Sequence, residues 1–187
     1  MSKLFFSNYF KNLQSNLNDI DLLKLEKLAS QIKKCKKKKG KLVILGNGGS
    51  SSTSNHLAID FTKNAKIKAI SFSDSSLITC LCNDYGHENW MSKALELYAN
   101  KDDIVIFISC SGNSKNIVNA AKYCINKKIK IATFTGMSKK NKLKLLNKDI
   151  FNFWINSKAY NFIELLHLAM LLSVVDFIIG KTIYKAS

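Results

Sequence analysis

The sequence predicts an α/β protein built on a parallel sheet, because the order of strand, polar turn and helix occurs twice along its 187 residues. In the first unit the apolar run 42–45 precedes a glycine-rich turn and a helix that begins near Ser50. In the second unit the apolar run 104–108 precedes the hydroxyl-rich turn 109–114. Short continuous apolar runs are typical of strands buried on both faces of a parallel sheet. Such units place the carboxyl ends of their strands side by side, and ligands bind at that edge.

The chain length and 47% hydrophobic content predict a single domain over residues 1–187. Its formal net charge of +16 comes entirely from an excess of lysine, without the arginine that reads base edges in bidentate fashion, so nucleic-acid binding is not expected. Five cysteines without a CxxC pair favour a reduced, cytoplasmic protein. Residues 162–179 approach membrane-spanning length, but they carry three ionisable side chains, and we interpret them as a core or interface helix with no membrane contact.

The elements follow in order along the chain. Residues 1–40 have helical apolar spacing and predict one or two N-terminal helices, and residues 41–157 form the sheet core. Within the core, further strands are expected at 67–72, 128–134 and 149–154, helices after residue 117 and around Trp90, and a loop at 83–86. Residues 158–187 contain the C-terminal helix, expected from about 160 to 181.

The turn after the first strand predicts an anion site. Three glycines allow a sharp turn and close approach of a ligand, and the helix that follows begins with unpaired N–H groups and the positive end of its dipole. His56 and Asp60 are four residues apart, so they share one face of that helix. The alternative is a tight structural turn with a packing histidine and a solvated carboxylate, since neither nucleotide-binding glycine motif is present.

Glu164 and His167 are three residues apart on the last helix, a spacing that helical metal sites use. If they converge with His56 and Asp60, the four side chains would suit a divalent metal such as zinc. The alternative is that Glu164 serves the first turn of its helix and that His167 is a satisfied core residue.

Together, the GNGGS turn with a histidine six residues later, the Asn83-Asp84-Tyr85-Gly86 segment and the turn 109–114 resemble the SIS (sugar isomerase) domain, and within it the phosphoheptose isomerases. The resemblance extends over nearly the whole chain. It implies a five-stranded parallel sheet flanked by helices, in a flavodoxin-like sandwich, and a homotetramer with active sites between subunits.

The resemblance also implies roles for individual residues. His56 matches a zinc ligand, Asp60 stands where the family has a glutamate that is both ligand and catalytic base, and Glu164 stands at a glutamine ligand. The metal set would be His56, Asp60 and Glu164, and the catalytic set Asp60, Glu164 and His167. The substrate-binding residues, with the serine turn holding the phosphate, would be Asn47, Gly48, Gly49, Ser50, Asn83, Asp84, Ser109, Cys110, Ser111 and Ser114.

One position departs from the family in a way that matters for catalysis. The family's catalytic histidine would fall on Leu172, which can neither bind metal nor move a proton, so His167 is the nearest substitute. The aspartate at position 60 keeps a carboxylate but shortens its reach.

Three functions follow from this resemblance. The first is an aldose–ketose isomerase that converts sedoheptulose 7-phosphate to a heptose 7-phosphate for bacterial surface polysaccharide. The second is a non-catalytic SIS protein that binds a sugar phosphate or a protein partner, of the replication-initiator-associating type. The third is an isomerase of another phosphorylated sugar.

Overall fold

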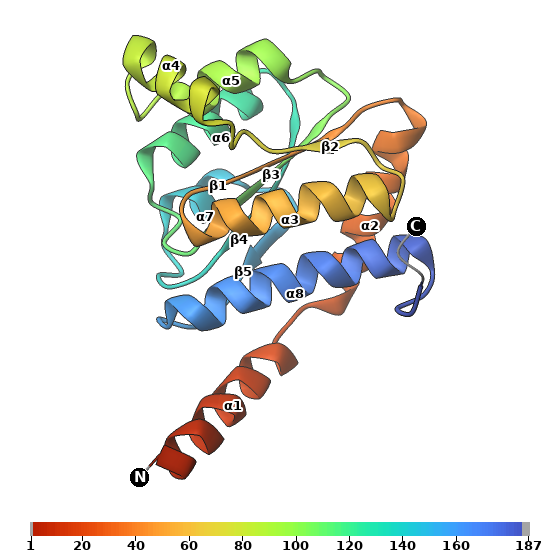
Figure 1. Cartoon of the computed structure of the whole chain (residues 1–187), viewed down its shortest axis with the longest axis vertical. Coiled ribbons are helices and arrows are strands. Elements are labelled where there is room, and N and C mark those ends of the chain that lie inside the picture. The colour runs from red at the N-terminus through yellow and green to blue at the C-terminus, as the bar shows by residue number, and fades with distance from the viewer. Residues whose placement is uncertain (1, 185–187) are drawn as a thin grey trace.

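The computed structural model describes residues 2–184 and contains a five-stranded parallel sheet with helices on both faces (Figure 1). The strand order is β2-β1-β3-β4-β5. The strands are β1 (Leu42–Gly46), β2 (Ala69–Ile70), β3 (Ile104–Ser109), β4 (Lys130–Thr135) and β5 (Asn152–Trp154). The predicted fold class is therefore confirmed. Residue 1 and residues 185–187 of the predicted domain lie outside the described residues.

The helices occupy the connections and the two ends of the chain. They are α1 (Ser2–Asn18), α2 (Leu22–Lys37), α3 (Gly49–Lys63), α4 (Ser75–Tyr85), α5 (Trp90–Tyr98), α6 (Lys115–Asn126), α7 (Lys142–Leu146) and α8 (Tyr160–Ile179). The two expected N-terminal helices and the long C-terminal helix are present.

The sheet separates two hydrophobic layers, because alternate side chains of each strand point to opposite faces. In β1, Leu42 and Ile44 pack with the layer formed by α2, α3 and α8, while Val43 and Leu45 pack with α4, α5 and α6. The central strands β1 and β3 are buried along their whole length, which explains their continuous apolar runs. Helices thus cover both faces of the sheet, and the edge formed by the carboxyl ends of its strands is the expected place for a ligand-binding site.

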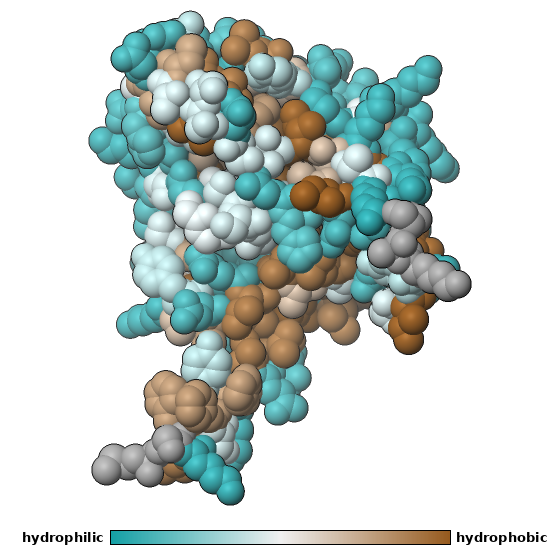
Figure 2. Space-filling model, in the orientation of Figure 1, coloured by the Kyte–Doolittle hydropathy of each residue, from teal (hydrophilic) through white to brown (hydrophobic). Residues whose placement is uncertain are grey.

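Helix α1 extends away from this body, as Figure 1 shows. Its residues Leu4, Phe5, Phe6 and Phe10 are each more than half exposed, and apolar colour covers much of α1 in Figure 2. The ring of Tyr9 packs edge-on against Phe162 of α8 at 4.6 Å between centroids. Leu13 of α1 is partly buried against the core, but the exposed residues of α1 present an unusually apolar surface to solvent.

Helix α8 is the one helix within residues 2–184 that is long and apolar enough to cross a membrane by length and composition. It packs against α2 and α3, and side chains such as Ile163, Leu166 and Leu171 are buried in the core. This packing agrees with the predicted core helix.

Two expectations for residues 67–86 were wrong in detail. The predicted loop at 83–86 is instead the last turn of α4, followed by Gly86, which ends the helix at a φ of 80°. Asp74 caps the start of α4 by accepting a hydrogen bond from the Leu77 N–H (2.9 Å). The predicted strand 67–72 is reduced to Ala69–Ile70 at the sheet edge. There the Thr62 hydroxyl bonds both the N–H and the carbonyl oxygen of Ala69, so these backbone groups are satisfied without another strand.

Candidate functional site

The two predicted turns meet at the carboxyl edge of the sheet, because β1 and β3 are paired neighbours over residues 42–46 and 104–108. A reciprocal amide pair joins them. Asn47 donates to Asn116, and Asn116 donates back to Asn47, each at 3.0 Å. Asn116 is 1% exposed, and its side-chain Oδ1 also accepts from the Ile117 N–H. The pair fixes the glycine turn against the start of α6.

The glycine turn leads directly into α3. Gly48 adopts a φ of 53°, which favours glycine, and a Cβ at Gly49 would lie 2.6 Å from Glu164 Oε1. The turn thus lets α8 bring a carboxylate against the backbone at the start of α3. The N–H groups of Ser50 and Ser51 donate to the carbonyl oxygens of Asn47 and Gly48, so this end of α3 offers fewer free donors than the sequence suggested.

The serine turn combines rigid backbone with available hydroxyls. The Gly112 N–H donates to Ser109 Oγ at 3.2 Å and the Asn113 N–H donates to Ser111 Oγ at 3.2 Å. Both hydroxyls accept in these bonds and keep their own protons to donate. Ser114 is the N-cap residue of α6, and its side chain makes no capping hydrogen bond. These groups can bind an anion at the positive end of a helix.

Cys110 lies beneath this turn beside Glu164. Its Sγ is 3.9 Å from Glu164 Oε1, and its side chain is buried. Burial, followed by the charge of Glu164, raises the pKa of the Cys110 thiol to about 11. Cys110 is therefore a neutral thiol near the carboxylate and not a nucleophile.

His56 and Asp60 form a pair on α3, as their spacing predicts. The distance from His56 Nε2 to Asp60 Oδ2 is 3.2 Å, and the side chains are 52% and 19% exposed. The carboxylate can orient the imidazole, and together the two offer nitrogen and oxygen donors of the kind zinc prefers.

The structure does not bring these two together with Glu164 and His167 in one protomer. Glu164 contacts Gly49, and Asp60 is eleven residues further along α3, which at 1.5 Å per residue is roughly 16 Å. Among residues 2–184, no group of three or more His, Cys, Asp or Glu side chains is placed to hold a metal ion. A zinc site needs at least three protein ligands, so one described protomer does not supply the predicted set.

His167 occupies a core position. It is fully buried, its Nε2 is 3.2 Å from the Thr135 carbonyl oxygen, and its ring packs edge-on against Phe134. Burial lowers the pKa of His167 to about 4, although the Thr135 carbonyl acts in the opposite direction. The expected convergence on His56 is thus absent within a protomer, and we assign His167 no proton transfer.

A cavity of about 790 Å³ opens where the turns meet. Of the ten predicted substrate-binding residues three line it, Asn47, Gly48 and Ser114, whereas Gly49, Ser50, Ser109, Cys110 and Ser111 do not. Asn83 and Asp84 are exposed at the end of α4 and do not line it. The residues that follow them do, from Tyr85 to Glu88. Sequence reasoning missed His87, Glu88, Lys115 and Asn116 as part of this site. A histidine directly after the Asn-Asp-Tyr-Gly segment was the available clue.

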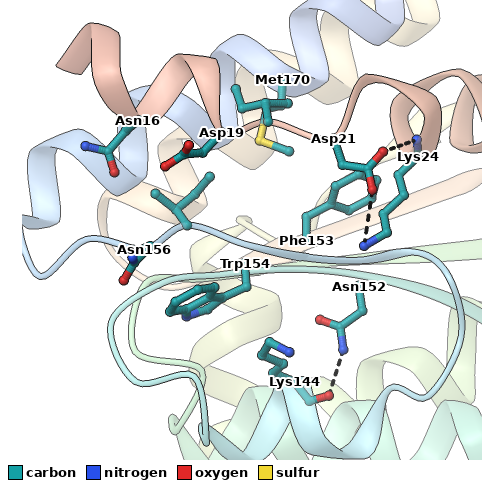
Figure 3. Close-up of a pocket in the computed structure, with 12 residues that line it drawn as sticks. Asn16, Asp19, Asp21, Lys24, Lys144, Asn152, Phe153, Trp154, Asn156 and Met170 are labelled. Atoms are coloured by element: carbon teal, nitrogen blue, oxygen red, sulfur yellow. Dashed lines mark hydrogen bonds and ion pairs between the residues drawn. The ribbon is translucent and has the colours of Figure 1, made fainter. Parts of the chain in front are cut away.

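A second pocket, of about 430 Å³, lies between the α1–α2 connection, β5 and α8 (Figure 3). Two of its polar side chains are engaged locally, since Asn152 donates to the Lys144 carbonyl oxygen at 2.7 Å and Asp21 caps α2 and pairs with Lys24, whereas the buried Nε1 of Trp154 has no hydrogen-bond partner among the described residues. None of the predicted site residues lines this pocket, so it is separate from the candidate site.

Comparison with known proteins agrees with the fold. The family model described as SIS domain matches residues 6–136. Phosphoheptose isomerase of Cytophaga hutchinsonii is 41% identical over 117 residues, 60% of this chain and 61% of that protein. Phosphoheptose isomerase of Fusobacterium nucleatum is 33% identical over 156 residues, 81% of this chain and 79% of that protein. The match thus spans about three fifths of the first relative and about four fifths of the second.

A solved structure of phosphoheptose isomerase from Neisseria gonorrhoeae superimposes with a TM-score of 0.87 at 23% identity, covering 95% of this chain and 98% of that one. The corresponding structure from Francisella tularensis has a TM-score of 0.87 at 22% identity, with coverage of 97% and 100%. At this identity the two superpositions show the shared fold. The chain belongs to the SIS domain family and is similar to the phosphoheptose isomerases within it.

Proposed function

We propose that this protein is an aldose–ketose isomerase of a phosphorylated seven-carbon sugar, converting sedoheptulose 7-phosphate to D-glycero-D-manno-heptose 7-phosphate for surface-polysaccharide synthesis. The observation that carries the proposal is one cavity lined by Asn47 and Gly48 of the glycine turn and by Ser114 of the serine turn, whose hydroxyl makes no capping hydrogen bond. Its similarity to phosphoheptose isomerases supports the choice of substrate. The free cysteines support a cytoplasmic location.

The chemistry needs a base that removes the proton from the carbon beside the carbonyl, and groups that stabilise the resulting enediolate. Asp60 is the proposed base, because its carboxylate is partly exposed and is oriented by His56. Glu164 is the proposed partner that returns a proton, because it reaches the start of α3 beside the glycine turn. The serine turn holds the phosphate and so fixes the sugar relative to these groups.

Asp60 and Glu164 are too far apart in one protomer to act on the same carbon, so the proposal includes a second copy of the chain. The exposed apolar side chains of α1 offer a surface for self-association. A homotetramer in which Glu164 of one copy faces His56 and Asp60 of another would also complete a three-ligand zinc site. No step of the reaction is assigned to the metal.

The first experiment is proton NMR of sedoheptulose 7-phosphate in deuterated buffer with purified protein, with and without zinc. Exchange at the carbon beside the carbonyl, or an aldose signal, is expected from the wild type and not from a folded Asp60→Asn variant. Full exchange by Asp60→Asn would refute the assignment of the base.

Mixing two inactive variants tests the shared site. Asp60→Asn and Glu164→Gln each lose activity, but a mixed oligomer contains sites with both wild-type residues. After subunit exchange at equal amounts, a dimeric pair of sites should recover about a quarter of wild-type activity. No recovery, in a mixture whose subunits are shown to exchange, would place both residues in one protomer's site or remove one of them from catalysis.

A second candidate function is binding without catalysis. Leu172 favours it, because the position is apolar and partly buried against the core, so it supplies no proton-transfer group. Broadening of the sugar-phosphate resonances without exchange would support this function over the isomerase.

A further inference from the structure

The cavity at the sheet edge has a wall to which the proposed function assigns no role. Three segments line it, namely the turn after β1, the start of α6 and residues 85–88 after α4. Its volume of about 790 Å³ is in the range of small-molecule sites. The first two segments include three of the proposed sugar and phosphate contacts, Asn47, Gly48 and Ser114. The third contributes His87 and Glu88, and α6 adds Lys115 opposite them.

Hydrogen bonds fix the floor of the cavity, whereas the side chains of this wall are available to bind a ligand. Asn47 and Asn116 use their amides on each other, so they form a rigid base. The segment that carries His87 is anchored as well, since Asn119 of α6 donates to the Glu88 carbonyl oxygen at 3.0 Å. The His87 side chain is exposed to the cavity from an anchored backbone.

Lys115 is held only loosely by its neighbour. Its Nζ is 3.4 Å from Glu88 Oε2, and the two side chains are 79% and 53% exposed. An ion pair this exposed contributes little to stability, so the ammonium can move to a ligand at small cost. Lys115 is also the first residue of α6, where a positive charge is disfavoured by the helix dipole unless an anion lies nearby.

We propose that His87 and Lys115 bind the phosphate group of the sugar, as a wall of the cavity that is charged through Lys115 and lies beside Ser114. This inference rests on the proposed function and adds to it the residues that select phosphorylated over free sugars. The ammonium has three donors, and the imidazole donates one N–H when neutral and two when protonated. Charge-assisted hydrogen bonds of this kind add to the neutral donors of the serine turn.

Calorimetric titration with sedoheptulose 7-phosphate and with unphosphorylated sedoheptulose tests the wall. Lys115→Gln should weaken binding of the phosphorylated sugar about tenfold and His87→Gln about threefold, with binding of the free sugar changed less than about twofold. Added salt should weaken wild-type binding more steeply than binding by Lys115→Gln. Lys122→Gln, an exposed lysine further along α6, is the matched control and should behave as wild type.

The outcomes separate this inference from the proposed function. Wild-type binding of the sugar phosphate with unchanged affinity in both variants would overturn the charged wall and leave the proposed function standing. If the variants bind the phosphorylated and the free sugar with equally weakened affinity, the substitutions act on the structure and the charged wall is also overturned. Failure of the wild type to bind the sugar phosphate would overturn both.

Discussion

Acid should destabilise the protein through His167, whose environment in the core accepts only the neutral ring. Nε2 donates to the Thr135 carbonyl oxygen, and Nδ1 has no hydrogen-bond partner among the described residues. Protonation would place an N–H at Nδ1 with nothing to accept it, inside a fully buried apolar layer. The pKa of His167 is lowered to about 4 by this burial.

The size and sign of the effect follow from the two pKa values. In the unfolded chain histidine titrates near 6.5, so above that pH both states are neutral and the full stability is present. As pH falls below 6.5, the histidine is protonated in the unfolded state but not in the folded state, so the free energy of unfolding decreases until the pH reaches about 4. The loss from this one group is about 2 kcal/mol between pH 7.5 and pH 5.

Urea denaturation followed by circular dichroism at pH 7.5 and pH 5, at fixed protein concentration, measures this loss. His167→Gln, which stays uncharged, should lose about 2 kcal/mol less than wild type over the same interval, because carboxylates titrate equally in both. His56→Gln, measured in parallel, is the control for replacing a histidine outside the core, since His56 is 52% exposed. An identical pH dependence for wild type and His167→Gln would refute the reasoning.

Two further predictions concern groups that hold the sheet edges and turns. Asp103 is 2% exposed and accepts hydrogen bonds from the Lys41 N–H and Nζ, so Asp103→Ala should lower the free energy of unfolding by about 3 kcal/mol. Asp102 pairs with Lys38 at the surface, so Asp102→Ala should lower it by less than about 1 kcal/mol. Equal losses in urea denaturation would contradict this ranking. Gly112→Ala should cost on the order of 2 kcal/mol or more, because Gly112 has a φ of 62° and its Cβ would collide with Asn141; a midpoint unchanged from wild type would show that the turn relaxes freely.

The sequence predicts the sheet well where burial dictates residue type on both faces of a strand. The runs in β1 and β3 are buried at every position, so only apolar residues fit, and their boundaries were predicted to within a residue. The sequence predicts a longer edge strand than β2, whose Ala69 backbone groups are bonded by a side chain from α3, the Thr62 hydroxyl. No local pattern in residues 67–72 contains that information.

The end of α4 shows a different limit. Asn83, Asp84 and Gly86 are residues typical of turns, so the segment was interpreted as a loop. In the structure the Asp74 cap starts the helix eight residues or more before them, and the helix continues until Gly86. This difference matters for the site, because it displaces Asn83 and Asp84 from the cavity lining and brings His87 and Glu88 to it.

The candidate site could be predicted as two turns but not as a set of converging side chains. Spacing of three residues puts Glu164 and His167 on neighbouring parts of α8, about 60° apart around its axis. That angle suffices to separate them, because α8 packs against α3 on one side and the sheet on the other: Glu164 reaches Gly49, while His167 reaches the Thr135 carbonyl oxygen of β4. A small angular difference on a packed helix therefore places Glu164 beside the glycine turn and His167 in the fully buried core. The shared spacing that suggested a metal motif is equally the spacing of a helix that contacts two elements at once.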